Sequence, residues 1–172
     1  NGKYIMTGSD SGSIKIWDKK VGSLLGNLSF DGLCGSNFSS VQENHIILTF
    51  TDGSIKLLDI DAGKILLELK GHNDVVWSAE ESFNGKYIIS ESDDETIKVW
   101  DRQTGNLLIN LDIGARVTFL MESKDGRNII ATTEFGMIQI WNIETGELQL
   151  KLADGKNKEC IVKESNDGKY LI

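Results

Sequence analysis

The sequence predicts an all-β protein that repeats a unit of four short antiparallel strands. Two markers recur about every 41 residues, and a period of roughly 40–45 residues with several strands is typical of propeller blades. One marker is a short apolar run that ends in a Trp-Asp-like pair: Trp17-Asp18, Leu58-Asp59, Trp100-Asp101 and Trp141-Asn142. The other is a glycine followed by Lys or Arg: Gly2, Gly85, Gly126 and Gly168. We therefore predict a β-propeller with about four blades' worth of strands.

The third repeat shows the strands of one unit most clearly. Residues 75–79 form a short apolar run, and residues 87–89 begin a second strand. Residues 96–100 alternate, with Ile97 and Val99 facing one way and Lys98 the other, and residues 107–111 form a fourth strand. The predicted turns are a two-residue hairpin at Asn84-Gly85, residues 93–95, and Thr104-Gly105. Because four strands fill the repeat, we expect no helix longer than a turn.

The phase of the strands indicates an incomplete ring. The chain opens in the second strand of a blade, at residues 3–8, and closes at the same point in residues 169–172. Residues 1–172 are therefore predicted to be one propeller segment with a truncated last repeat. An open array would leave apolar blade faces and sheet edges exposed. We expect either a piece of a longer propeller or two copies that complete a ring of about eight blades.

Composition excludes several classes of function. The chain has 18 Lys and Arg against 26 Asp and Glu, a net charge of −8, and its acids are spread through the turns. A phosphate-binding surface needs clustered basic residues, so we expect no nucleic-acid partner. No apolar run approaches the ~20 residues that cross a bilayer, so we expect no membrane partner. Cys34 and Cys160 are interpreted as core thiols, which favours a reducing compartment, the cytoplasm or the nucleus.

These residues resemble the WD-repeat β-propeller family, and the best match runs from Gly71-His72 to Trp100-Asp101. The resemblance covers essentially the whole chain and is specific for fold rather than for biochemical role. It implies rings that most often have seven blades. It also implies a hydrogen-bonded tetrad in a blade, which the third repeat supplies as His72, Ser90, Asp94 and Trp100. His, Asp and Ser are also the residue types of a catalytic triad, but the Trp spacing explains all of them, so we predict a structural network.

The other repeats depart from the tetrad. Ser11 stands at the Asp position of the first repeat, although Thr7 and Trp17 are present. Leu48 and Leu58 replace Ser and Trp in the second repeat, and Ala131 and Phe135 replace Ser and Asp in the fourth. We expect one blade to have its full polar network and the others to rely on apolar packing.

Three acids precede the glycine turns of successive repeats: Glu81, Glu122 and Glu164. This position is commonly apolar in the family. The simpler interpretation is a solvated strand end near the turn. The functional one is a ring of carboxylates on one face that binds a basic peptide or a cation.

The function predicted from these features is a non-catalytic scaffold that binds partner peptides or domains through the loop face of the propeller. Trp and Arg are the residue types that anchor interfaces, so the candidate binding residues are Trp77, Arg116, Glu91 and Asp74. Blade-to-blade packing is the alternative interpretation of Trp77, and a solvated loop charge is that of Arg116.

An enzyme is the rival class of function. Metal and acid–base sites need convergent His, Cys or carboxylates, yet the only histidines are His45 and His72. We therefore expect no catalytic residues, no metal and no cofactor. A regulatory or sensor propeller attached to a catalytic domain in a longer chain stays open as a further alternative.

Overall fold

The computed structural model describes residues 3–9, 12–40, 44–153 and 161–165 together with Gly168 and Tyr170, and for residues 34–40 it describes the backbone alone. The chain divides into two compact units, residues 1–80 and residues 81–172, which are described separately. The side chains of Cys34 and Cys160 lie outside what the structure describes, and so does the predicted closing strand at residues 169–172 except for Tyr170.

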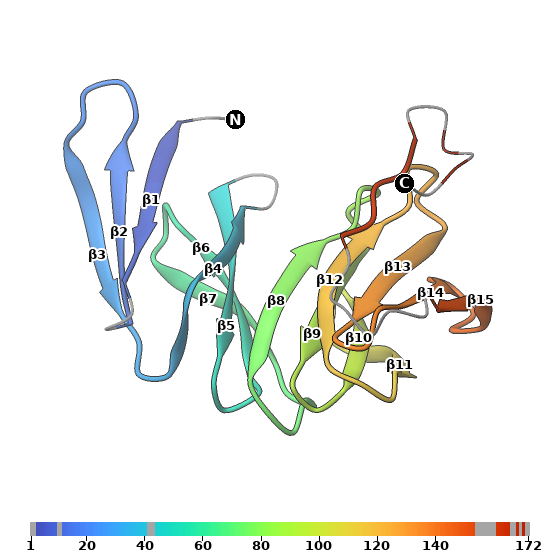
Figure 1. Cartoon of the computed structure of the whole chain (residues 1–172). Helices are drawn as coiled ribbons and strands as arrows, with labels where there is room; N and C mark the ends of the chain where they lie inside the picture. The colour runs from blue at the N-terminus through green and yellow to red at the C-terminus, as the bar shows by residue number, and fades with distance from the viewer. Residues whose placement is uncertain are drawn as a thin grey trace. The chain divides into compact units, whose positions relative to one another are not determined.

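The fold is all-β, as predicted, with fifteen strands in four antiparallel sheets, each a propeller blade, and with no α-helix in the part of the chain described above (Figure 1). Blade 1 contains β1 (Tyr4–Gly8), β2 (Ser13–Asp18) and β3 (Leu24–Ser29). Blade 2 contains β4 (Leu33–Ser40), β5 (His45–Phe50), β6 (Ile55–Asp59) and β7 (Lys64–Leu69). Blade 3 contains β8 (Val76–Glu81), β9 (Tyr87–Ser92), β10 (Thr96–Asp101) and β11 (Leu107–Asp112). Blade 4 contains β12 (Val117–Glu122), β13 (Asn128–Thr133), β14 (Met137–Asn142) and β15 (Leu148–Ala153).

The four blades share one strand register. The last two strands of each blade form a hairpin whose pairing register shifts by one residue at one point. The pairs that directly precede this shift are Ile16 with Gly26, Leu57 with Leu67, Val99 with Ile109, and Ile140 with Leu150. The shift falls at the Trp position of every repeat, so each blade has a β-bulge there. Equivalent residues of different blades therefore occupy equivalent backbone positions and are directly comparable.

In blade 3, the third strand, β10, is buried on both faces. Ile97 and Val99 are at most 1% exposed, as the alternation predicts. Lys98 faces the other way, but it is only 5% exposed and its ammonium donates to the Asn110 side chain. A blade in a propeller packs against a neighbour on each side, so a polar residue on this strand needs a partner within the fold.

Each unit has its own apolar core. Buried aliphatic side chains contribute about 1.5–3 kcal/mol each, so these clusters hold consecutive blades together. The core of the first unit consists of Ile14, Ile16, Leu33, Ile46, Leu48, Phe50 and Leu58. The core of the second consists of Ile89, Ile97, Val99, Leu111, Ile113, Val117, Ile129, Ala131 and Ile143.

The turn at Asn84-Gly85 differs from the prediction. A two-residue type I′ hairpin needs positive φ at both central residues, but only Gly85 has it, at 68°. The Ser82 N–H donates to the Tyr87 carbonyl at 3.0 Å, so four residues lie between the two residues that close the turn. The Asn84 side chain organises this longer turn, because its Oδ1 accepts from Ser82 Oγ and from the Lys86 N–H, both at 2.9 Å.

Candidate functional site

The Trp100 indole anchors a polar network inside blade 3. Trp100 is 1% exposed, and its Nε1–H donates to Ser90 Oγ at 2.9 Å. Ser90 is fully buried on β9, the strand that pairs with β10. A buried indole N–H needs an acceptor, and Ser90 supplies it. A serine hydroxyl with no exposed surface cannot reach a substrate, so its burial argues for the structural role and against a nucleophile.

The other two members of the predicted tetrad are His72 and Asp94. His72 is 6% exposed, and it belongs to the first unit. Asp94, in the turn between β9 and β10, accepts from the Thr96 N–H at 3.1 Å and from Thr96 Oγ1 at 2.6 Å. Because His72 lies in a different unit from the other three residues, the structure establishes the Ser90–Trp100 half of the network.

The other blades were expected to rely on apolar packing, but two of them also hold the indole N–H with a hydrogen bond. In blade 1, Trp17 Nε1–H donates to Thr7 Oγ1 at 3.3 Å. In blade 4, where Ala131 removes the hydroxyl, Trp141 Nε1–H donates to Gln139 Oε1 at 3.1 Å. Gln139 is 2% exposed, and its amide also donates to the Ile113 carbonyl at 3.0 Å. Blade 2 has Leu58 in place of the indole, both it and Leu48 are buried, and that blade relies on apolar packing as predicted.

Comparisons with known proteins agree with this geometry. The family model described as "WD domain, G-beta repeat" matches residues 1–18 and 63–101. The U3 small nucleolar RNA-associated protein 21 homolog of Schizosaccharomyces pombe is 29% identical over 122 residues, which cover 69% of this chain and 13% of that protein. The WD repeat domain-containing protein 83 homolog of Dictyostelium discoideum is 31% identical, over 63% of this chain and 34% of that protein. Over residues 1–18 and 63–101 the chain is therefore similar to WD-repeat proteins.

A solved structure matches the fold of nearly the whole chain. The crystal structure of the computationally designed Ika8 protein superposes with a TM-score of 0.80 at 26% identity, over 96% of this chain and 51% of that one. Autophagy-related protein 16 of Arabidopsis thaliana is 28% identical, over 59% of this chain and 20% of that protein. The chain thus spans between 13% and 34% of the three curated relatives.

Within this WD-repeat array, two of the three recurrent glutamates bind the turn of the preceding blade. Glu122, at the end of β12, accepts from the Phe83 N–H of blade 3 at 2.7 Å. Glu164 accepts from the Lys124 N–H of blade 4 at 2.7 Å. Phe83 and Lys124 are equivalent positions, so both contacts belong to one repeated interaction. Glu81 instead pairs with Arg102, with 3.2 Å between Oε1 and Nε.

These contacts add partners that neither interpretation of the acid set included. The carboxylates are not simply solvated strand ends, because Glu122 is half-buried. Burial raises the pKa of the Glu122 carboxyl, and the hydrogen bond from the Phe83 N–H offsets part of this shift by lowering the pKa. Each of the three carboxylates also has a partner within the fold. We call the Glu122–Phe83 and Glu164–Lys124 contacts the glutamate clamps.

The predicted loop-face residues fall in both units. Trp77, on β8 in the first unit, is 39% exposed although its strand neighbours Val76 and Ala79 are 0% and 4% exposed. Asp74 is exposed in the loop that enters β8, and its Oδ1 accepts from the Val75 N–H at 2.8 Å. Trp77 therefore offers a large apolar surface at the start of a well-packed strand.

In the second unit, Arg116 has a specific partner. Its Nε lies 3.2 Å from Asp93 Oδ1, and the side chains are 50% and 30% exposed. This pair links the loop before β12 to the turn between β9 and β10. Arg116 is therefore not only a solvated charge, and sequence reasoning missed Asp93 although it stands next to Asp94. Glu91 is half-buried on β9 opposite Ile97.

Other site types find no support in the described part of the chain. Its residues hold no group of three or more His, Cys, Asp or Glu side chains arranged to bind a metal ion. The same residues include no helix that is long and apolar enough to span a membrane.

Proposed function

We propose that this WD-repeat array is a non-catalytic scaffold that binds partner peptides or domains through its loop face, with Trp77 as the main anchor. The exposure of Trp77 carries the proposal. The repeat does not require an indole there, because blade 4 has Thr118 at the same position, where its Oγ1 lies 3.1 Å from Thr132 Oγ1. An exposed Trp on a rigid strand loses little conformational freedom when it is buried by a partner.

Asp74 on the first unit, and Arg116 and Glu91 on the second, are proposed as polar contacts to the partner. Charged groups at the rim of an interface mainly affect the association rate and its salt dependence. The Arg116–Asp93 pair would hold Arg116 in one orientation before binding. Exposed ion pairs contribute roughly 0–1 kcal/mol, so its role would be positional rather than stabilising.

The test compares recovery of partners by wild type and by Trp77→Ala in a pull-down from cell extract, after circular dichroism has shown that both are folded. Losing an interface anchor typically costs about 2 kcal/mol or more, roughly thirtyfold in affinity. Leu108→Ala is the matched control, because Leu108 is 50% exposed on an outer strand. We expect Trp77→Ala to lose the partners and Leu108→Ala to keep them. Equal recovery by the two variants would remove Trp77 from the site.

A second array is proposed to complete the propeller. The chain covers 51% of the designed protein that it matches, so the other half corresponds to a similar number of blades. Those blades would come from a second copy of the chain or from further repeats of a longer one. A regulatory propeller joined to a catalytic domain in a longer chain is the alternative, and the curated relatives are long enough to hold further domains. Light scattering that shows a dimer would favour two copies.

The proposed location is the cytoplasm or the nucleus. The relatives' names include a protein associated with U3 small nucleolar RNA and the nuclear distribution protein PAC1 of Arthroderma otae. Imaging of the tagged full-length protein would choose between the two compartments.

A further inference from the structure

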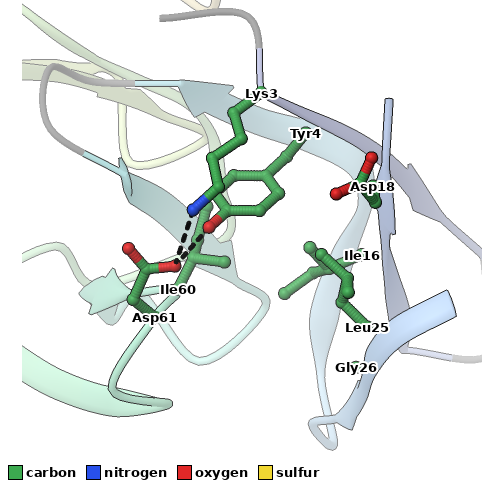
Figure 2. Close-up of a pocket in the computed structure, with 8 residues that line it drawn as sticks. All are labelled: Lys3, Tyr4, Ile16, Asp18, Leu25, Gly26, Ile60 and Asp61. Atoms are coloured by element: carbon green, nitrogen blue, oxygen red, sulfur yellow. Dashed lines mark hydrogen bonds and ion pairs between the residues drawn. The ribbon is translucent and has the colours of Figure 1, made fainter. Parts of the chain in front are cut away.

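A cavity of about 400 Å³ lies between blade 1 and the turn after β6 in blade 2 (Figure 2). Tyr4, Ile16 and Leu25 line it from blade 1, and Ile60 and Asp61 line it from blade 2. Figure 2 shows Asp61 and Ile60 on one side, Ile16 and Leu25 on the other, and the Tyr4 ring and Lys3 chain extending toward Asp61. Its size is within the range of about 300–1,000 Å³ that is usual for small-molecule sites.

The cavity exists because Gly26 has no side chain. The equivalent residues of the other blades are Leu67, Ile109 and Leu150, each paired in the same register. In the second unit, Ile109 fills the corresponding space: a Cβ added to Gly146 would lie 2.9 Å from Ile109 Cγ2. A Cβ added to the equivalent Gly63 would have nothing within 4 Å. The space between blades 3 and 4 is therefore filled by Ile109, whereas the equivalent space between blades 1 and 2 is left empty.

The inner wall of the cavity is aliphatic. Ile16 is 4% exposed and belongs to the core of the first unit, against which Ile60 also packs. Leu25 is 53% exposed and forms part of the rim. A ligand that enters far enough to cover these groups gains roughly 25 cal/mol for each Å² of apolar surface that it removes from water.

The mouth of the cavity carries two carboxylates and one ammonium. Asp61 accepts from the Tyr4 hydroxyl and, at 2.6 Å, from Asn44 Nδ2. Lys3 Nζ lies 4.0 Å from Asp61 Oδ1 and 4.8 Å from the centre of the Tyr4 ring. Asp18 lines the cavity too, while its Oδ1 holds the next turn through the Lys20 and Val21 N–H groups at 2.7 and 3.0 Å.

This mouth already places an ammonium over an aromatic ring and beside a carboxylate. Hydrogen bonding with Tyr4, followed by the charge of Asp61, raises the pKa of Lys3. The hydrogen bond that the Tyr4 hydroxyl donates to Asp61 lowers the pKa of the Asp61 carboxyl. Lys3 and Asp61 are 55% and 51% exposed, so Lys3 can move into solvent. Two carboxylates against one ammonium leave the mouth with one excess negative charge, in a chain with net charge −8.

We propose that this cavity binds a lysine side chain of a partner polypeptide. The aliphatic stem lies against Ile16 and Ile60, and the ammonium replaces that of Lys3 between Asp61, Asp18 and the Tyr4 ring. A compact ammonium on a flexible four-carbon stem matches an aliphatic wall with an acidic mouth. This site is separate from Trp77, and the inference does not depend on the proposed loop-face function.

The test is a two-dimensional NMR titration of the ¹⁵N-labelled chain with the blocked peptide acetyl-Gly-Lys-Gly-amide. We expect saturable shifts of the Gly26 and Ile60 amides, with a dissociation constant near the millimolar range, which is typical of ~4 kcal/mol of binding free energy. The matched norleucine peptide has no charge and should bind several-fold more weakly. Equal shifts with both peptides, or no shifts, would overturn the proposal. If free n-butylamine bound with the same affinity as the peptide, the assignment to a polypeptide ligand would be overturned.

Variants separate this site from nonspecific binding. Gly26→Ile should abolish the shifts, because it supplies the side chain that fills the space in blade 3. Asp18→Asn should weaken binding about three- to fivefold, and it should not disturb the fold, since Asn142 holds the equivalent turn of blade 4 through the Glu144 and Thr145 N–H groups at 2.9 and 2.8 Å. Asp101→Asn, at the filled site, is the matched control and should change nothing. Binding that survives both Gly26→Ile and Asp18→Asn would place the lysine elsewhere.

Discussion

The Glu122 carboxylate accepts a hydrogen bond from the Phe83 N–H, so a strand end in one blade holds the turn of the blade before it. Glu164 makes the same contact with the Lys124 N–H. Both distances are 2.7 Å, which is short for N–H···O and typical of a charged acceptor. The glutamate clamps thus join consecutive blades through polar contacts in addition to the apolar core.

Glu122→Gln should change how stability depends on pH. Burial raises the pKa of the Glu122 carboxyl above its ordinary value of 4.5. A carboxyl whose folded-state pKa is raised contributes stability below pH 4.5 and loses it as pH rises through the folded pKa. The glutamine keeps a neutral acceptor for the Phe83 N–H and does not titrate. The unfolding free energy of Glu122→Gln, compared with that of wild type, should therefore be higher at pH 7 than at pH 4.

Urea unfolding at the two pH values measures this difference. Glu80→Gln is the control for the loss of one negative charge, because Glu80 is exposed one residue before Glu81. A variant-minus-wild-type difference that is the same at both pH values would contradict a buried, titrating Glu122.

Ser90→Ala should destabilise blade 3. The substitution leaves the buried Trp100 Nε1–H without its acceptor at 2.9 Å, and a buried polar group without a partner costs about 1–3 kcal/mol. Denaturant midpoints of the two proteins would show the change. Ala131→Ser, at the equivalent position of blade 4, is the control and should have little effect, because Gln139 already accepts from Trp141. If Ser90→Ala left the midpoint unchanged, the indole would need another acceptor.

Glu95→Gly should stabilise the protein. Glu95 has φ of 63°, whereas the same turn position in the other repeats is Gly12, Gly53 or Gly136. The left-handed region costs a non-glycine residue roughly 1–2 kcal/mol, and the greater freedom of glycine in the unfolded chain offsets part of the gain. We expect a net increase in unfolding free energy of about 0.5–1 kcal/mol.

The reverse change at Gly53 provides the control for Glu95. A Cβ on Gly53 would lie 2.5 Å from the His72 carbonyl oxygen, so Gly53→Ala should cost at least about 2 kcal/mol. Thermal unfolding of both variants should shift in opposite directions. A lower melting temperature for Glu95→Gly would show that the glutamate side chain compensates for its backbone strain.

Ile109→Ala and Gly26→Ile should also act in opposite directions. Ile109 packs against the core of the second unit, and its truncation should cost roughly 2 kcal/mol, the lower end for a buried Ile→Ala change. Gly26→Ile fills an existing space and removes glycine from a strand, so it should be neutral or stabilising by up to about 1 kcal/mol. Chemical denaturation measures both. A large destabilisation by Gly26→Ile would mean that the cavity is too narrow for the side chain.

The strands could be predicted from sequence because the same sequence pattern recurs in each repeat and indicates the same strands each time. The spacing of Trp17, Trp100 and Trp141 fixes the third strand of three blades and the bulge that follows it. The functional residues that the sequence did not predict are those that depart from the repeated pattern. Gln139 replaces the hydroxyl that Ala131 removes, and it stands where the other repeats have lysine, at Lys15, Lys56 and Lys98.

The remaining errors come from contacts between blades, which a periodic pattern does not report. The recurrence of Glu122 and Glu164 was visible, but their partners are backbone N–H groups, and these have no sequence signal. The role of Gly26 was hidden for a related reason: a missing side chain becomes a cavity only when the facing turn, at Gly63, also leaves the space empty.

Gly26 and Ile109 show that one repeat of a tandem array can differ from another by lacking a single side chain. The two residues share one pairing register, so removing a side chain in one copy leaves the backbone in place and the other copies intact. Because the stability of a repeat array is approximately a sum over its repeats and their interfaces, one copy can lose a packing contact while the others keep theirs. Glycines at aliphatic positions of individual repeats are therefore a simple signal to search for when new sites are sought in other repetitive chains.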